Sequence, residues 1–290
     1  MNICHLIIAH NKPEQVARLA KSLRLPGSDI YVHVDKKTDI NAFTFLESQG
    51  VRFVKKRVKV NWGGYSLVEA IVSSLEEIRD GGKPYEFINL LSAQDYPIKK
   101  ASDFTAFLQE NKGKCFIFYE DVEGLFWWKE NIVRLTRYHF NDFPVKGKYM
   151  AQRLVNFLLP TRKFPMNWKL YGGSCSTWWT LPAEAAYFLA HTIGNNRKLR
   201  RFAKLTWGAD EYLFATILMN SDFKSRVVNN NYRFIDWSEK NPRPKLLTIK
   251  DLQAISASES FFARKFDESV DAYVLDKLDE LLAGKDHRTG

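Results

Sequence analysis

The chain is 290 residues long, with 45% hydrophobic and 26% charged residues, a composition typical of a globular protein with a full core. Its 43 basic and 33 acidic residues give a net charge of +10, which favours anionic partners such as nucleic acid, an anionic membrane or phosphorylated small molecules. The sequence has no long basic tail and no zinc-finger, KH or RNP signature, so nucleic acid is not an expected partner.

The first half of the chain alternates short apolar strands with helices. The strands are predicted at 2–10, 29–35, 51–54, 86–95 and 115–120, and the helices at 13–23, 66–78 and 101–110. This order predicts an α/β fold with a mostly parallel, doubly wound sheet flanked by helices. Ligands of such sheets lie beyond the carboxyl ends of the strands, which points to His10, Asp35, Gln94 and Asp95.

Residues 121–170 are rich in aromatic and basic side chains and are predicted to form an insertion. It contains one amphipathic helix near 148–159, which is suited to covering an acceptor groove, to contacting a membrane surface or to ordinary packing.

The remaining part of the chain is predicted to contain strands at 176–182 and 231–237, with helices at 183–192, 209–220 and about 267–284. Because no linker or repeat interrupts the chain, we expect a single domain over 1–290. Its parts are a nucleotide-binding half (1–120), the insertion and an acceptor half (171–290).

No run of 18 apolar residues predicts a transmembrane helix, and the N-terminal segment is too short for a signal peptide. Cys4, Cys115 and Cys175 lie far apart without metal-binding spacing, so reduced thiols are expected. The six histidines form no HxH or HExxH pair that would indicate zinc. We therefore expect a cytoplasmic protein.

Several common phosphate-binding and nucleophile motifs are missing. No GxGxxG follows the first strand, no GxxxxGK[ST] is present, and Ser174 does not lie in a GxSxG elbow. What remains is an α/β sheet, a carboxylate pair at a helix start and basic residues late in the chain. This combination suits a sugar-nucleotide transferase, in which a carboxylate deprotonates the acceptor and cations stabilise the departing diphosphate.

The carboxylate pair is Asp210-Glu211, within WGADEYLFATIL at 207–218. Spacing alone favours a role at the helix start, because acidic residues there accept backbone N–H bonds and complement the helix dipole. The pattern therefore leaves both a structural and a chemical role open.

Eight segments in order resemble the core-2/I-branching glycosyltransferase family, which contains β-1,6-N-acetylglucosaminyltransferases and is related to peptide O-xylosyltransferases. They are HLIIAHNKPEQVARLAKSL, IYVHVDKKTD, NWGGYSLVEA, INLLSAQDYPIK, GGSCSTWWTL, GADEYLFATIL, RFIDW and FFARKFD. The resemblance extends from about residue 2 to 270. It implies a GT-A-like fold and an inverting, metal-independent transfer from a UDP-sugar.

The resemblance implies that Glu211 is the general base, while Asp210 keeps its place at the helix start and borders the sugar site. It also implies that Lys265 and Arg243 bind the diphosphate, with Lys245 as the substitute for Arg243. Asp35 is followed by two lysines, so the DxD motif that holds a metal in other GT-A enzymes is absent.

Further residues follow from the resemblance and the strand ends. Asp35 is expected to contact the uridine, and His10 with Asn11 the base, although His10 equally suits a strand-end turn. Tyr65 is expected to stack near uracil or to serve in packing. The sugar-site candidates are Gln94, Asp95, Trp179 and Trp237. For Gln94 and Asp95, the alternative is a turn before Pro97. Trp178 and Trp179 suit the core and the site rim equally.

The chain departs from animal members in lacking their membrane anchor and disulfide framework, so it resembles a bacterial, cytosolic relative. Ser238 follows RFIDW where the branching enzymes have a second aromatic residue. We expect N-acetylglucosamine as the transferred sugar, with xylose as the alternative, and no divalent metal. The expected acceptor is a glycan, a lipid-linked sugar or a polysaccharide, with peripheral contact to an anionic inner membrane. The alternative from another class is a non-catalytic protein that binds anionic polymers.

Overall fold

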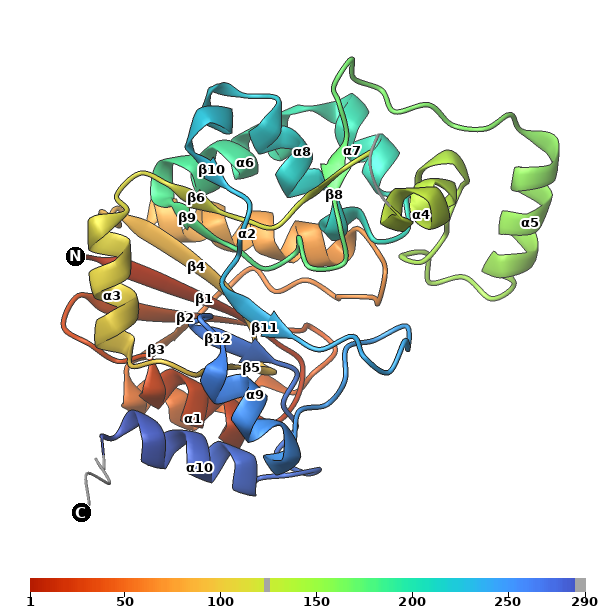
Figure 1. The fold of residues 1–290 in the computed structure, drawn as a ribbon. Helices are drawn as coiled ribbons and strands as arrows, with labels where there is room; N and C mark the ends of the chain where they lie inside the picture. Colours follow the sequence, from red (N-terminus) through yellow and green to blue (C-terminus); the bar gives the residue numbers. More distant parts are fainter. Residues whose placement is uncertain (123–125, 285–290) are drawn as a thin grey trace.

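The computed structural model describes residues 1–122 and 126–284, whose centre is a seven-stranded sheet (Figure 1). The strands are β1 (Ile3–Ala9), β2 (Ser28–Val34), β3 (Val51–Phe53), β4 (Phe87–Ser92), β6 (Cys115–Phe116), β9 (Thr180–Pro182) and β10 (Val227–Val228), in the order β10-β6-β9-β4-β1-β2-β3. Only β9 runs antiparallel to its neighbours. The prediction of a mostly parallel α/β sheet is confirmed.

Helices cover both faces of this sheet (Figure 1). One face carries α2 (Ser66–Asp80), α6 (Ala183–Asn195) and α8 (Leu213–Met219), and the other α1 (Pro13–Ser22), α3 (Ala101–Glu110) and α10 (Tyr273–Leu282). Along β1, Leu6 and Ile8 pack into the first core, while Ile3 and Ile7 pack into the second. This alternation, with both sets apolar, explains why β1 reads as a continuous hydrophobic run.

The strand order reverses at β1, which pairs in parallel with both β2 and β4. The chain builds β2 and β3 on one side of β1 and then crosses to place β4 on the other. The carboxyl ends of three neighbouring strands therefore open to a common edge, the usual ligand position in such a sheet.

A second sheet explains why the predicted strand at 86–95 was too long. The chain leaves the central sheet after Ser92 and re-enters regular structure as β5 (Asp95–Pro97), which pairs with β12 (Phe262–Arg264) beside β11 (Arg233–Ile235). The carboxylate of Asp95 accepts a hydrogen bond from the Ser92 backbone N–H at 3.0 Å, which closes the intervening turn.

Other predicted elements were also too long, among them the strand at 176–182, of which only β9 is formed. The strand at 115–120 is divided between β6 and β7 (Glu120–Asp121), which pairs with β8 (Tyr171–Gly172). The helix at 209–220 begins as a 3-10 turn, η2 (Ala209–Glu211), and is interrupted at Tyr212, whose φ of −132° leaves the helical region, before α8. The last helix starts at Tyr273, because Asp267 closes a polar turn with Ser269.

The insertion contributes α4 (Phe126–Thr136) and α5 (Lys148–Leu158), and α5 confirms the helix predicted near 148–159. The other helical segments are η1 (Ile40–Gln49), α7 (Arg197–Ala203), η3 (Asp222–Arg226), η4 (Ile249–Asp251) and α9 (Leu252–Ala257). None of the described helices is both long and apolar enough to cross a membrane.

A buried arginine joins the two sheets. Arg233, on β11, donates to the Asn89 side chain at 2.7 Å and to the backbone carbonyls of Leu90 and Trp179 at 3.0 and 3.1 Å. Asn89 also accepts a hydrogen bond from Thr180 at 2.9 Å. Burial lowers the pKa of Arg233 to about 10, so its retained charge depends on these acceptors.

We predict that Arg233→Met lowers the free energy of unfolding by about 2–4 kcal/mol, because charged hydrogen bonds are lost and buried acceptors keep fewer partners. Chemical denaturation measures the change. Arg24→Met, at an exposed arginine, is the control and should change stability by less than about 0.5 kcal/mol. Equal effects of the two substitutions would show that Arg233 does not join the sheets.

Candidate active site

The backbone around Glu211 is held by glycines. Gly208 has a φ of +68°, a conformation that side chains rarely tolerate, and it starts the turn that contains Glu211. The Gly173 N–H donates to the Glu211 carbonyl at 2.8 Å. A Cβ on Gly172 would overlap the Glu211 carbonyl and the Tyr212 backbone. The GGS and WGADE segments therefore need their glycines to pack together.

The carboxylate of Glu211 forms an ion pair with Arg134, at 2.6 Å from Oε2 to Nη1. Burial, followed by the charge of Asp210, raises the pKa of Glu211 to about 7, and Arg134 opposes part of that rise. The side chain is still 24% exposed. Glu211 is therefore an accessible carboxylate that exchanges its proton near neutrality, as a general base requires.

Asp210 has a different environment. Its carboxylate accepts a hydrogen bond from the Thr177 hydroxyl at 2.8 Å, and burial raises its pKa. Asp210 lies in the first turn of η2, at the helix start where it was predicted, although the N-cap residues Gly208 and Tyr212 make no side-chain cap bond. Asp210 is also tied to the 177 segment and adds negative charge beside Glu211.

Arg134 is itself held between two loops. Its guanidinium carbon lies 3.7 Å from the ring centre of Trp207, which makes an edge contact with Trp62 at 5.3 Å between ring centres. The Gly208 N–H donates to the Gly63 carbonyl at 2.9 Å, and a Cβ on Gly63 would overlap the Trp207 indole. The NWGG and WGADE segments thus form one packed unit that places Arg134 against Glu211.

A group of cations lies beyond the ends of β4 and β12. Arg264 is 3.0 Å from the buried carboxylate of Asp95, and its guanidinium carbon is 4.8 Å from the ring centre of Trp178. The pKa of the Asp95 carboxyl is raised by burial and held down by Arg264. Since Asp95 is only 1% exposed, its place as a sugar contact is corrected to that of a support for Arg264.

Lys265 and Arg243 extend this group. Burial and then the charges of Arg264 and Arg243 lower the pKa of Lys265, as expected for cations that share one region. The pKa of His10 is likewise lowered by burial and then by Lys265. The guanidinium carbon of Arg243 lies 5.6 Å from the ring centre of Trp62. These cations form an anion-attracting region at the switch point of the sheet.

The ends of β1 and β2 border the same region. His10 and Asn11 are exposed after β1, and Asp35 follows β2, with its N–H bonded to the Ala9 carbonyl at 2.8 Å. The Asp35 carboxylate accepts a hydrogen bond from the Lys37 N–H at 2.8 Å. Its charge opposes part of the lowering of the His10 pKa that burial and Lys265 cause, which indicates that the two strand ends are close.

The carboxylate pair and the cations belong to one site. The charge of Arg264 acts on the Asp210 carboxyl and lowers its pKa against the effect of burial. Thr177 and Trp178 are consecutive, and they contact Asp210 and Arg264 respectively. The segment before β9 therefore connects the general-base candidate with the cations.

A hollow of about 550 Å³ is bordered by Trp207. It is lined by Asn61, Trp62, His139, Asn141, Lys148, Tyr149, Gln152 and Trp207. Three aromatic rings combined with amides suit a sugar, whose apolar face stacks on rings while its hydroxyls bond to polar groups. Trp207 contacts both this hollow and Arg134, which places the hollow next to Glu211.

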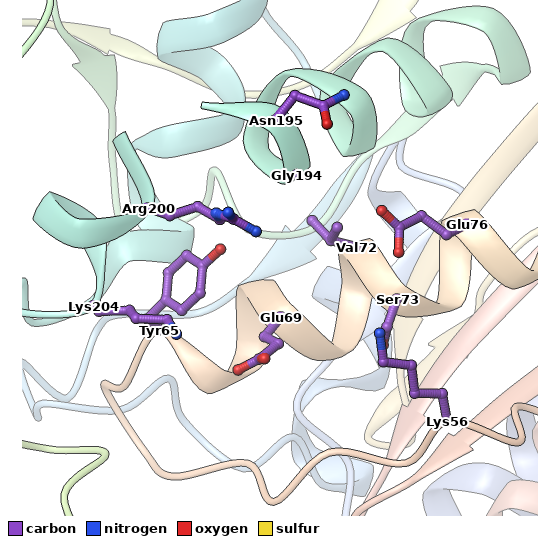
Figure 2. A pocket seen from close by; sticks show the side chains of 10 residues that line it. All are labelled: Lys56, Tyr65, Glu69, Val72, Ser73, Glu76, Gly194, Asn195, Arg200 and Lys204. Atoms are coloured by element: carbon purple, nitrogen blue, oxygen red, sulfur yellow. The ribbon is translucent and has the colours of Figure 1, made fainter. Parts of the chain in front are cut away.

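Tyr65 lies elsewhere. It is 3% exposed at the start of α2 and borders a separate cavity of about 160 Å³ with Lys204 and Arg200 (Figure 2). This volume is below the range of about 300–1,000 Å³ typical of ligand pockets. The prediction that Tyr65 stacks on uracil is therefore corrected to its alternative, a packing residue.

Two further candidates are corrected by their surroundings. Trp179 is fully buried and packs edge-on against Phe214, so its ring belongs to the core and not to the site rim. Lys245 forms ion pairs with Asp251 at 2.6 Å and Asp236 at 3.8 Å. It is therefore a poor substitute for Arg243, which extends beside Trp62 and Lys265.

Trp237 and Gln94 are both partly exposed and remain candidates for the sugar site. Trp237 is half-buried, with its indole nitrogen enclosed near the Cys175 thiol, and it can offer only part of its ring to a ligand. Gln94 is partly exposed at the end of β4, and its carbonyl accepts the Phe266 N–H at 2.9 Å. This bond ties the β4 end to the segment that carries Lys265.

Five site residues were missed in the sequence. Arg134 lies in the loosely patterned insertion and gave no usable signal. Trp62 and Arg264 lie within NWGGYSLVEA and FFARKFD, near the predicted site residues Tyr65 and Lys265. Thr177 lies within GGSCSTWWTL, and Trp207 directly precedes GADEYLFATIL, where adjacency to a glycine turn was the available signal.

The model of the Core-2/I-Branching enzyme family matches residues 3–258, and the chain belongs to this family. It is 26% identical over 294 residues to "Xylosyltransferase oxt" of Drosophila melanogaster and 28% identical over 309 residues to "Xylosyltransferase 2" of Homo sapiens. These alignments cover 93% and 98% of this chain but 32% and 34% of the relatives. The chain thus spans about a third of their length.

Solved structures are similar at a greater distance. Mouse xyloside xylosyltransferase 1 in its apo form has a TM-score of 0.39 and 12% identity, with 90% of this chain and 97% of the other covered. A glucose-1-phosphate thymidylyltransferase structure from Bacillus anthracis has a TM-score of 0.41 and 9% identity, with 99% and 97% covered.

We predict that the Glu211 carboxyl titrates with an apparent pKa of about 7, against the usual 4.5, and that Arg134→Gln raises it further by removing the paired cation. Carboxyl-carbon NMR, assigned with Glu211→Gln, measures both values. Arg137→Gln changes an exposed arginine just beyond α4 and is the control, which should leave the titration in place.

The same pKa shift has a consequence for stability. Because the folded protein holds this proton more tightly than the unfolded chain, Glu211 stabilises the fold below about pH 4.5, and that contribution is lost as pH rises towards 7. A Glu211 signal that titrates at its ordinary value, with no effect of Arg134→Gln, would contradict the assigned environment.

Proposed function

We propose that the chain is an inverting glycosyltransferase that moves a sugar from a UDP-sugar to an acceptor hydroxyl. The observation that carries this proposal is the position of Glu211, a half-buried carboxylate with a pKa of about 7, beside a group of cations at the sheet's switch point. Membership of the Core-2/I-Branching enzyme family supports the same conclusion.

In the proposed reaction, Glu211 takes the proton of the acceptor hydroxyl as its oxygen forms a bond to the anomeric carbon of the donor. The bond between that carbon and the UDP oxygen breaks, and its electron pair leaves with UDP. Attack opposite to the leaving group inverts the anomeric configuration. Arg134 orients Glu211 through their ion pair at 2.6 Å. The charge of neighbouring Asp210 raises the pKa of Glu211, which makes it a stronger base.

On the donor side, we propose that Lys265 and Arg243 contact the diphosphate, and that Arg264 adds charge from behind Trp178. Preorganised donors aimed at developing negative charge contribute about 3–4 kcal/mol each in comparable sites. Asp35, His10 and Asn11 are proposed to border the uridine. These protein cations would serve where other nucleotide-sugar enzymes use a metal, so we propose that no divalent cation is required.

The transferred sugar has two candidates. The family resemblance favours N-acetylglucosamine, whereas the names of the curated relatives favour xylose. The slow hydrolysis of a panel of UDP-sugars without acceptor distinguishes them, because a donor whose sugar does not fit the site is hydrolysed more slowly.

For the acceptor, we propose a glycan, a lipid-linked sugar or a polysaccharide that lies in the hollow lined by Trp62, Trp207 and Tyr149. The rings would stack against a sugar ring while Asn61 and Gln152 bond to its hydroxyls. This arrangement would direct an acceptor hydroxyl past Trp207 towards Glu211.

We predict that Glu211→Gln lowers turnover of the preferred UDP-sugar by about 10²–10⁴-fold, because the amide cannot accept the acceptor proton. The affinity for UDP should change by less than about threefold, since the substitution keeps the side-chain shape. Glu259→Gln, at an exposed position, is the matched control and should keep full activity. A fully active Glu211→Gln protein would overturn the proposed base.

We also predict that UDP binds equally well with and without EDTA, and that Lys265→Met weakens this binding by at least tenfold. Titration calorimetry measures both effects. Lys250→Met removes a lysine of equal charge from the exposed surface and should have no effect.

The outcome of this titration also separates the two classes of function. Strong EDTA sensitivity would contradict a metal-free site. Absence of UDP binding, together with salt-sensitive binding of heparin-like chains, would support a non-catalytic polymer-binding protein instead.

A further inference from the structure

Helix α5 is turned the opposite way from an ordinary surface helix. Its polar side chains face the protein: Asn156 bonds to both the N–H and the carbonyl of Tyr138 at 2.8 Å, and Gln152 accepts from the Phe140 N–H at 2.9 Å. Lys148 donates to the Asn141 carbonyl at 2.9 Å. Positions 148, 152 and 156 lie one helical turn apart and so form one face. The polar face is thus the attached face.

The apolar face of α5 is exposed. Met150 is 78%, Leu154 57%, Phe157 84% and Leu158 66% exposed, and no residue of the helix is buried. Tyr149 on the helix and the exposed flanking residues Phe143, Val145 and Leu159 enlarge this surface. A surface helix normally buries its apolar stripe in the core, and contiguous apolar patches of this kind mark contact sites. Figure 1 shows α5 at the edge of the molecule, beyond α4 and away from the sheet.

From Phe143 onward, the charged residues of this segment are all basic. The sequence contains no acidic residue from Phe143 to Ala183. Lys146, Arg153 and Lys163 are exposed on or near the helix. An apolar face with basic residues along its edges matches the interface of an anionic bilayer, where the rings and aliphatic groups enter the acyl boundary and the cations meet the headgroups. A second copy of the chain would bring the same positive charges together, which disfavours self-association through this face.

We propose that α5 and its flanks, residues 143–159 with Lys163, bind the surface of an anionic membrane. Lys148, Tyr149 and Gln152 of the same helix line the hollow that leads towards Trp207. A membrane seated on α5 would therefore bring this hollow to the bilayer surface. This last step rests on the proposed transferase activity: if that activity holds, the acceptor sugar is carried on a lipid.

Vesicle co-sedimentation tests the proposal without any donor or acceptor. The full chain is mixed with vesicles of phosphatidylcholine alone or with a quarter of phosphatidylglycerol, at low and high salt. We expect binding to the anionic vesicles at least tenfold stronger than to the neutral ones, and weaker at high salt. Phe157→Ser with Leu158→Ser should reduce it at least tenfold, because less apolar area is available to enter the lipid.

Matched variants keep the test specific. Val270→Ser with Tyr273→Ser removes two similarly exposed apolar residues beside α10 and should leave binding unchanged. Lys146→Gln with Arg153→Gln should weaken binding to anionic vesicles, whereas Arg197→Gln with Lys198→Gln, at exposed positions on α7, should not. Thermal unfolding and UDP titration check that each variant keeps its fold and its donor site.

Vesicle binding and turnover are independent readouts, so failure of this proposal is distinguishable from failure of the proposed chemistry. No preference for anionic vesicles, or equal binding of wild type and the Phe157/Leu158 variant, would overturn it. A concentration-dependent dimer in analytical ultracentrifugation that the same variant abolishes would assign the face to a second copy instead, and would also overturn it.

Discussion

The ion pair between Arg134 and Glu211 is the interaction on which the site depends. Burial and neighbouring Asp210 both disfavour a negative charge on Glu211, and only a cation at close range keeps the carboxylate partly ionised near neutrality. Arg134 needs the Trp207 ring beneath it, and Trp207 needs Gly63 beside it. The insertion, the NWGG loop and the WGADE turn are therefore coupled through one guanidinium group.

Burial and neighbouring charges also set the properties of the cations Arg264, Lys265 and Arg243. Arg264 is held by buried Asp95 and by the Trp178 ring, so its charge is fixed before any anion arrives. Burial, and then the charges of Arg264 and Arg243, lower the pKa of Lys265, and a bound diphosphate would relieve the repulsion among these cations. The site thus combines a base whose pKa is raised to about 7 with cations that favour an anionic leaving group, and both ends are tied to the strand-end segments of one sheet.

Much of this arrangement was predictable from the sequence, for identifiable reasons. The carboxyl ends of parallel strands lie at the same edge of a sheet for any loop conformation. His10, Asp35 and the region of Gln94 could therefore be grouped from the βαβ order alone. The burial of individual side chains could not be predicted from the strand order in the same way. Trp179 and Tyr65 occupy motif positions but pack into the core, and Asp95 faces Arg264. Arg134 reaches Glu211 across 77 positions of sequence, a contact that no local pattern encodes.

The pH dependence of kcat/KM for the preferred UDP-sugar, measured in EDTA, tests the central claim most directly. If Glu211 is the base in its present environment, activity rises with pH through an apparent pKa of about 7, and the profile needs no added metal. A profile that is flat from about pH 5 to 8, or activity that appears only with a divalent cation, would contradict the account.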